Sequence, residues 1–528
     1  MPSAVAASAP PAPNTPTAIQ CSVEILLSAH SESISRDKFA SALQNVNWAL
    51  EGRSPADVDA FQTQYGVSPA TFLAFLPTPE QSTRAADDET DVVVRTLTRI
   101  LEKLLMPMPF ARIADTQHGF GMVIHQGLVH PNPHVQDLAL FALEKAEPEE
   151  LISSQFFLPL VECLSSKSTA VGVRVSALLC KTAQTDAGLD ALFSADTVSI
   201  LTAQVDESQT NRFRVYDLAI SVSNISPRHL RVVQESSLLA TLLADLEDRA
   251  DVLRRLNVVQ VFQTLAGTEA GFQFLEQTDI LARLVAIMAA EAVDEIDDVL
   301  VVSAVIKFFS YVGGNTPSTF LAACTRHGIL DALATQLESE RGDLKESVVI
   351  ALGSIGSTSS GLAALSAHPT LVPSFLTLAR AASGDLKLRT LETASCLIAA
   401  GAGDSPLSDI SRSVYDATAG RGVLLRYARG AFLEPKIAAL AVMRAGAGHA
   451  WGAREIAADG ELVSWLVDRR AEMDTTVVEG KFVVVRELAA RPDAADVLGA
   501  GTLAQFARYV REGPRWREAA PMVAFQSS

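Results

Sequence analysis

Two histidines four residues apart are the residues of this chain whose type and spacing most directly suggest chemistry. His130 and His134 stand in the stretch HPNPH, directly before the apolar run VQDLALFAL. Two imidazoles at this spacing on one helical face can bind zinc when further protein ligands complete the shell. Here Pro131 and Pro133 lie between them, and proline prevents a regular helical presentation of both rings. We therefore interpret the histidines as turn or capping residues and predict no metal site.

Two further stretches contain residue types that bind phosphate or calcium. The Gly- and Ser-rich stretch 353–361 lacks both the preceding strand pattern and the following GK[ST] that a phosphate-binding loop requires. The acidic stretch 291–298 lacks the glycine and terminal glutamate of a calcium loop at the required spacing. Neither the GxSxG nor the HExxH motif of hydrolases occurs. The sequence thus predicts no catalytic residue and no cofactor, and we expect that the protein is not an enzyme.

The composition is typical of a large helical protein. Its 528 residues exceed what one hydrophobic core organises, so several domains or a repeat array are expected. Hydrophobic residues make up 48% of the chain and charged ones 20%, which is enough apolar side chain for a large core. Aromatic residues are only 6%, while Ala, Leu and Val dominate, and this favours closely packed helices over a β-sandwich.

The charge balance and the cysteines restrict partners and compartment. With 61 acidic against 43 basic residues the net charge is −18, and an acidic surface repels the phosphates of nucleic acid. The five cysteines are scattered, odd in number and without a CxxC motif, which favours reduced thiols. The chain start lacks a signal-peptide pattern, and the apolar runs are too short to cross a bilayer. We expect a cytoplasmic protein, with the nucleus as a second location, that binds neither nucleic acid nor membrane.

Nine segments share one helical pattern at a spacing of about 40–45 residues, which is the length of armadillo and HEAT repeats. An apolar residue leads each segment, and small or apolar residues follow four and five positions later. The leading residues are Val135, Val173, Val215, Leu253, Leu300, Leu344, Leu386, Ile437 and Val478. Between the segments recur a short piece with glycine and an apolar pair, such as AGLDALF or AGFQFLE, and a second short helix. Three helices per unit favour the armadillo form over the two-helix HEAT form.

These patterns predict an all-α fold, an armadillo/HEAT-like right-handed α-solenoid of roughly ten repeats. Each unit has apolar faces that it cannot bury alone, so neighbouring units stack and share a continuous core. We expect a disordered leader at 1–18, a degenerate N-terminal helical capping region at 19–110, the armadillo-like repeats at 111–512 and a C-terminal tail at 513–528.

The long helices of such arrays line a groove that binds other proteins. Helix geometry places eight residues in the predicted groove: Phe141, Lys145, Gln263, Lys307, Ser310, Arg389, Arg444 and Lys481. Phe141, Lys307 and Arg389 are the expected anchors, because a few large or charged side chains dominate the energetics of an interface. None of the four tryptophans falls on the nine segments, so the Trp–Asn ladder that nuclear-import adaptors use for basic peptides is missing. A folded domain is therefore at least as suitable a ligand as an extended peptide.

Several segments of the chain are similar, in order and approximate spacing, to one known family. They are Gly127–Val135, Thr185–Phe193, Arg212–Pro227, Val305–Val312, Leu386–Ile398, Glu461–Asp474 and Arg511–Pro514. On these segments the chain resembles the 26S proteasome non-ATPase regulatory subunit 5 family. The likeness runs from about residue 95 to residue 515 and is weak in the first ninety residues.

The resemblance implies a function without catalysis. Members of this family are assembly chaperones of the proteasome regulatory particle base. They bind the C-terminal small domain of one base ATPase subunit, escort its assembly module and leave before the proteasome is mature. The implied partners are that ATPase subunit and its module, and we expect the chain itself to be a monomer. The alternative is another armadillo-type protein-binding scaffold or transport adaptor.

Overall fold

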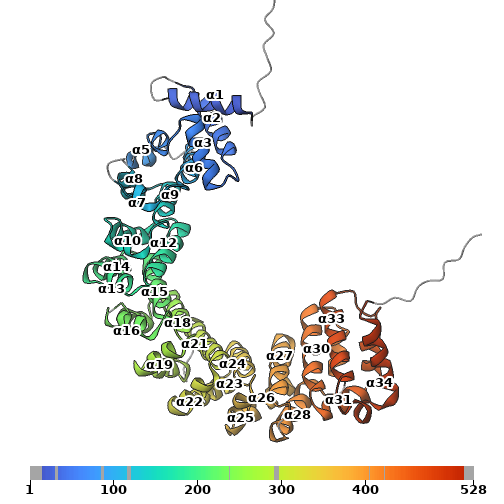
Figure 1. The fold of residues 1–528 in the computed structure, drawn as a ribbon. Coiled ribbons are helices and arrows are strands. Elements are labelled where there is room, and N and C mark those ends of the chain that lie inside the picture. The colour runs from blue at the N-terminus through green and yellow to red at the C-terminus, as the bar shows by residue number, and fades with distance from the viewer. Residues whose placement is uncertain are drawn as a thin grey trace, which may run out of the picture. The chain divides into compact units, whose positions relative to one another are not determined.

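The computed structural model describes residues 15–29, 34–84, 88–115, 120–236, 238–290, 296–403, 405–420 and 422–515, and within these ranges every regular element is a helix (Figure 1). Most of the predicted leader, most of the predicted tail and residues 291–295 of the acidic stretch lie outside the described residues. The leader prediction is wrong at its end, since α1 begins at Pro16, where Thr15 Oγ1 accepts the N–H of Ala18 at 3.3 Å. Threonine before proline is a favourable helix start.

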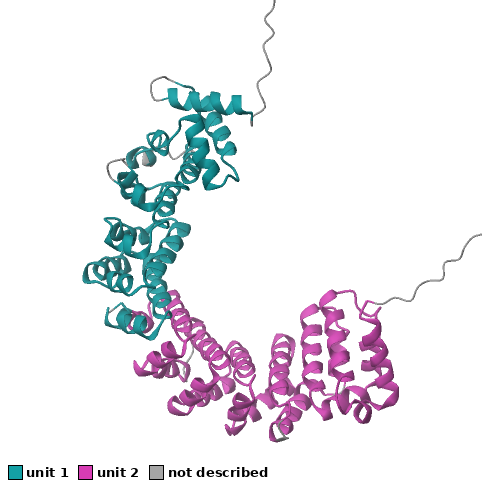
Figure 2. Cartoon of the chain, viewed as in Figure 1, with its two compact units in different colours: residues 1–241 teal, residues 242–528 magenta. Residues whose placement is uncertain are grey.

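The chain divides into two compact units, residues 1–241 and 242–528 (Figure 2). The sequence predicted one continuous array from 111 to 512 and gave no sign of this division. The helix α17 (Ala240–Glu247) contains the boundary.

Unit 1 is a stack of long helices, each packed on the next in the order α2, α6, α9, α12, α15. Its helices are α1 (Pro16–Ser28), α2 (Arg36–Ala49), α3 (Pro55–Tyr65), α4 (Pro69–Leu73), α5 (Pro79–Arg84), α6 (Asp88–Leu105), α7 (Phe110–Ile113), α8 (Phe120–Leu128), α9 (Pro133–Leu143), α10 (Pro148–Ser153), α11 (Phe157–Glu162), η2 (Cys163–Ser165), α12 (Thr169–Thr182), α13 (Asp186–Leu192), α14 (Ala195–Glu207), α15 (Gln209–Ser223) and α16 (Pro227–Glu235). The region expected to be only a degenerate cap thus supplies two long helices, α2 and α6, to the same stack as α9.

Unit 2 continues the three-helix pattern more regularly, and its long helices α18, α21, α24, α27, α30 and α33 pack in that order. Its helices are α18 (Val252–Leu265), α19 (Glu269–Gln277), α20 (Ile280–Met288), α21 (Ile296–Asn315), α22 (Pro317–His327), α23 (Ile329–Glu338), α24 (Gly342–Ile355), α25 (Ser359–Ala367), α26 (Leu371–Ala381), α27 (Gly384–Ala400), α28 (Ser405–Ala419), α29 (Val423–Ala428), α30 (Leu433–Ala447), α31 (Ala450–Ala458), α32 (Gly460–Val467), α33 (Thr475–Ala489) and α34 (Ala494–Glu512). The last helix, α34, packs on α31, α32 and α33.

All nine predicted segments form the long helices α9 to α33, and the all-α repeat fold is confirmed. From α9 onward two further α-helices stand between successive long helices, as α13 and α14 stand between α12 and α15. In the described part of the chain, no single helix is both long and apolar enough to span a membrane. The helices α25 and α26 reach the required length and apolar character only when taken together, and their axes are bent by 94° relative to each other.

A threonine–glycine corner starts the short helix of several repeats. In α19 the Oγ1 of Thr268 accepts the N–H of Gly271 at 3.1 Å, and the same bond joins Thr185 to Gly188. A Cβ on Gly271 would lie 2.0 Å from the carbonyl oxygen of Leu265 at the end of α18. The glycine is therefore needed because the short helix starts directly against the last carbonyls of the preceding long helix.

Candidate functional site

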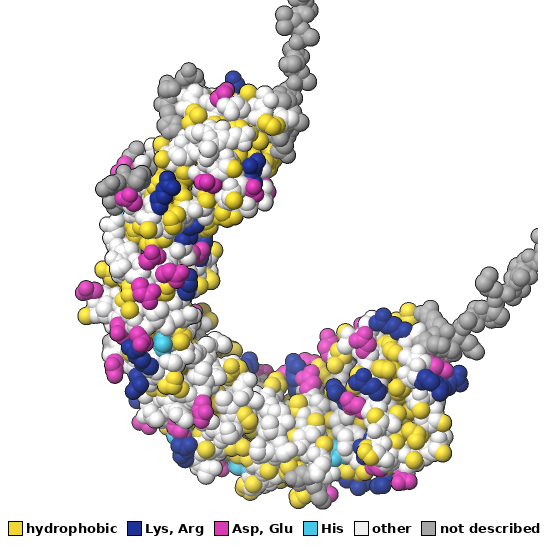
Figure 3. Space-filling model, viewed as in Figure 1, with side chains coloured by type: hydrophobic (Ala, Val, Ile, Leu, Met, Phe, Trp, Pro, Cys, Tyr) yellow, Lys and Arg dark blue, Asp and Glu magenta, His cyan; other side chains and the backbone are white. Residues whose placement is uncertain are grey.

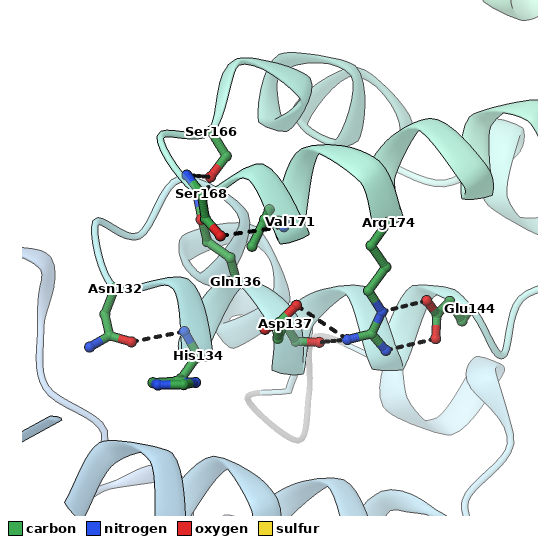
Figure 4. A network of polar contacts seen from close by, with 9 residues as sticks. All are labelled: Asn132, His134, Gln136, Asp137, Glu144, Ser166, Ser168, Val171 and Arg174. Atoms are coloured by element: carbon green, nitrogen blue, oxygen red, sulfur yellow. Dashed lines mark hydrogen bonds and ion pairs between the residues drawn. The ribbon is translucent and has the colours of Figure 1, made fainter. Parts of the chain in front are cut away.

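The HPNPH stretch forms a turn that caps α9. The buried ring of His130 accepts the N–H of Asn132 at Nδ1 (3.1 Å), so Nε2 carries the proton toward the carbonyl of Pro77 (3.1 Å). The side chain of Asn132 accepts the N–H of His134 at 2.9 Å (Figure 4). Burial lowers the pKa of His130, so its ring is neutral at neutral pH. The turn interpretation is confirmed for His130, whereas His134 is the second residue of α9 and its backbone N–H is capped by Asn132. Among the described residues no three His, Cys, Asp or Glu side chains are grouped to hold a metal ion.

The candidate binding site is the exposed side of the long helices, and each unit has its own. The unit 1 face consists of half-buried and exposed residues of α6, α9, α12 and the turn after α9. They are the half-buried Glu102, Phe141, Lys145 and Arg174 and the exposed Glu144 and Val173. We call Leu300, Lys307, Tyr311, Ile350, Arg389, Ile437 and Arg444 of α21, α24, α27 and α30 the unit 2 face. Both faces mix apolar with charged side chains, and the space-filling view shows such a mixture on the visible surface (Figure 3).

The unit 1 face is organised by an arginine that joins two long helices. Arg174 of α12 bonds Glu144 through Nε (2.6 Å) and Nη2 (2.8 Å), and its Nη1 reaches Asp137 Oδ1 at 3.3 Å (Figure 4). The hydrogen bonds that Arg174 donates to Glu144 are the largest cause of the raised pKa of Arg174. Close by, burial raises the pKa of Glu102. The carboxylates of Asp137 and Glu144 are already paired with Arg174, and Val173, 65% exposed, is the apolar residue of this face that is most accessible to a partner.

Phe141 and Lys145 lie together on α9 and the residues that follow it. The ammonium of Lys145 stands 5.8 Å from the ring centroid of Phe141 and donates to the carbonyl of Met106 at 2.7 Å. Burial lowers the pKa of Lys145. The lysine thus covers the end of α6, and the half-buried ring beside it is the more accessible of the two for apolar contact.

The unit 2 face contains two basic residues with different surroundings. Arg389 of α27 bonds Glu346 of α24 at 3.0 Å and Glu392 at 2.9 Å, so its charge is matched twice. Lys307 of α21 is exposed and forms no ion pair with any described residue. Between these helices Ile350 of α24 is 39% exposed. The exposed isoleucine provides apolar contact area, and the lysine and arginine on either side of it provide charged groups. A protein interface has the same arrangement, with an apolar centre and a polar rim.

The remaining predicted groove residues divide into surface and interior positions. Arg444 is exposed and pairs with Glu487 at 2.9 Å, and Gln263 is half-buried on α18. Ser310, with 8% exposure, and Lys481, with 1%, are buried, so their assignment to the groove is wrong. Lys481 lies against the ring of Trp465 in α32, with its ammonium 4.6 Å from the ring centroid.

Sequence reasoning missed four exposed apolar residues of the unit 2 face. They are Leu300, Tyr311, Ile350 and Ile437, with 47%, 36%, 39% and 40% exposure. A signal was present for Tyr311, because Leu300, Lys307 and Tyr311 follow one another at spacings of seven and four residues, which keeps them on one helical side.

Residues 75–528 match the family described as proteasome non-ATPase 26S subunit. The chain belongs to this family. The 26S proteasome non-ATPase regulatory subunit 5 of cattle is 26% identical over 436 residues, which cover 79% of this chain and 84% of that protein. The human protein of the same name is 26% identical over 437 residues, with the same coverage. Both faces lie inside the stretch that matches the family, and the chain has a proteasome-related role.

Solved structures confirm the fold. A structure of Kap95p with RanGDP superposes with a TM-score of 0.59 and 14% identity, covering 94% of this chain and 59% of that one. A Kap95–Nup1 complex gives a TM-score of 0.56 with 13% identity, over 93% of this chain and 63% of that one. This family member is therefore a helical-repeat protein of the armadillo and HEAT type, and at such identities the likeness concerns the fold alone.

Proposed function

We propose that the chain is an assembly chaperone of the base of the 26S proteasome regulatory particle. It binds the C-terminal small domain of one base ATPase subunit and leaves before the particle is mature. The match of residues 75–528 to the proteasome non-ATPase 26S subunit family is the observation that carries the proposal. The chain acts by binding rather than catalysis, as a monomer in the cytoplasm or the nucleus.

The unit 2 face supports this proposal physically. Tyr311 and Ile350 supply apolar contact area, while Lys307 supplies a charge that no described carboxylate neutralises. Aromatic and basic side chains at the centre of an interface contribute most of its energy. An interface of roughly 1,200–2,000 Å² between two folded domains is firm and still reversible. Such a complex is released when later subunits compete for the same domain.

The decisive experiment measures binding between the purified full chain and the isolated C-terminal domain of each base ATPase subunit. Isothermal titration calorimetry should give saturable binding to one of these domains and none to the others. Mass spectrometry of the proteins that co-purify from cells should find ATPase modules without core particle. Recovery of nuclear-transport or cytoskeletal proteins in their place, with no binding to any ATPase domain, would reject the proposal for the alternative of another scaffold or transport adaptor.

Lys307→Glu is expected to weaken binding to the ATPase domain by about tenfold, because it reverses the one charge of this face that is not already matched inside the unit. Arg389→Glu is less suitable, since it places a third carboxylate beside Glu346 and Glu392. The matched control is Lys167→Glu, which reverses an exposed lysine in the turn before α12, outside both faces. Equal dissociation constants for Lys307→Glu and the control would remove the unit 2 face from the interface.

A further inference from the structure

The loop between α32 and α33, residues 468–474, is held by two lysines of the surrounding helices and by one arginine of its own. Lys481 of α33 donates to the carbonyl of Asp468 at 2.7 Å, and Lys436 of α30 bonds both oxygens of Glu472 at 2.8 and 2.7 Å. Within the loop, Arg469 bonds Glu512 of α34 at 3.2 Å. A loop held at both ends in this way has little conformational freedom left to lose when it binds a partner.

This fixed loop presents apolar side chains to solvent. Met473 is 84% exposed, and Phe432, directly before α30, is 74% exposed. They are the two most exposed large hydrophobic residues in the described part of the chain. Phe432 stands one helical turn before Lys436, whose ion pair with Glu472 brings the start of α30 to the loop. Met473 also lines the groove beside the loop, so its exposed side chain is available to a partner bound there.

A groove runs between the loop and the end of α34. It encloses about 870 Å³, and its lining includes Val467, Arg470, Met473, Val478, Pro514 and Arg515. That volume falls in the range of sites that enclose a short peptide or a small ligand. Lys and Arg side chains gather at this end of unit 2, where the chain leaves α34 (Figure 3).

Basic side chains outnumber acidic ones in the lining of the groove, which contains Arg469, Arg470 and Arg515 against Asp468 and Glu472. The carboxylate of Glu472 pairs with Lys436, whereas that of Asp468 accepts the backbone N–H of Arg470 at 2.8 Å and keeps its charge. The guanidinium of Arg470 is exposed and forms no ion pair with any described residue. Arg515 reaches Glu479 only at 3.5 Å, with both side chains more than 60% exposed. On a chain of net charge −18, this groove is a place where basic side chains can attract a carboxylate.

We propose that this groove, with Met473 in its lining, is a second docking site that binds an acidic peptide segment of a partner protein through a carboxylate and an apolar anchor. Arg470 receives the carboxylate, because a guanidinium binds it through two parallel hydrogen bonds. Met473 packs against the apolar anchor, since its flexible thioether adapts to side chains of different shape. The site is separate from the unit 2 face and does not depend on the proposed chaperone function.

Fluorescence anisotropy with the full chain tests this site directly. The probe is a fluorescein-labelled short peptide in which glutamates flank a Leu-Phe pair, and its control has glutamine at each glutamate. The glutamate peptide should bind about tenfold more tightly than the glutamine peptide. Arg470→Glu and Met473→Ser should each weaken its binding by about tenfold. Arg380→Glu, an exposed arginine at the end of α26, should leave binding unchanged.

Three outcomes would overturn the assignment. One is equal binding of the glutamate and glutamine peptides, which would remove the role of charge. Another is a glutamate peptide that binds Arg470→Glu as tightly as the unchanged protein. The third is a dimer in light scattering that Met473→Ser dissociates, since the groove would then be an interface between two copies of the chain.

Both substituted side chains are exposed, so the variants should retain the thermal unfolding curve of the parent protein. If the peptide does not bind this groove, the proposed binding of the ATPase domain is unaffected. If the ATPase domain does not bind, the proposed peptide site is likewise unaffected.

Discussion

Gly271→Ala is expected to destabilise unit 2 by about 3 kcal/mol, at the upper end of what added volume in a packed site costs. The new Cβ would stand 2.0 Å from the carbonyl oxygen of Leu265 and 2.9 Å from its carbonyl carbon. These are backbone atoms at the end of α18, so no flexible side chain can move aside. The two helices would have to separate, and the bond from the Gly271 N–H to Thr268 would lengthen.

Urea unfolding followed by circular dichroism measures this effect, with hydrogen exchange of α19 to assign it to the repeat. The control is Gly342→Ala at the start of α24, where a Cβ would meet no atom within 4 Å. That change should be neutral or stabilising by up to about 1 kcal/mol, because alanine favours the helix. If both variants unfold at the same urea concentration, the corner glycine is not a steric requirement. Because the chain has two units, each transition is analysed separately.

Lys481→Met is expected to stabilise unit 2 at neutral pH by up to about 3 kcal/mol, because it removes a charge from a buried position. The ammonium of Lys481 lies 4.6 Å from the ring centroid of Trp465, and the side chain is 1% exposed. Burial lowers the pKa of Lys481 to about 8, against its ordinary value of 10.5, although Asp468 and Glu472 act in the opposite direction. The methionine loses the hydrogen bond to the carbonyl of Asp468, which reduces the gain.

The gain of Lys481→Met should depend on pH in one direction. The folded protein holds the Lys481 proton less tightly than the unfolded chain, so unfolding takes up a proton between about pH 8 and pH 10.5. The cost of the buried charge is fully present below pH 8 and disappears as the pH rises through this window. The free-energy difference between variant and parent should therefore shrink by up to about 3 kcal/mol. Urea unfolding of both proteins below pH 8 and near pH 10 tests this, and a constant difference would contradict a depressed pKa.

The sequence by itself determined the helices and their repetition. Helical periodicity is a local property, so the nine segments led by Val135 to Val478 were found without knowledge of their neighbours. The turn at HPNPH and the short piece that contains the glycine of AGFQFLE could also be predicted from the sequence, since proline and glycine influence the backbone through their own covalent structure. Similarity of short segments was enough to indicate the family.

Only the tertiary structure decided which side of each helix faces solvent. Ser310 and Lys481 were expected in the groove and are buried, while Ile437, the leading apolar residue of its segment, is 40% exposed. The tertiary structure also decided the contacts between residues that are separate in the sequence. They include the ion pair of Arg174 with Glu144, the hydrogen bond of Lys481 that holds the loop at 468–474, and the contacts that divide the chain after Thr241. Exposure and pairing depend on how neighbouring repeats stack, and stacking is set by the summed packing of many side chains rather than by any one segment.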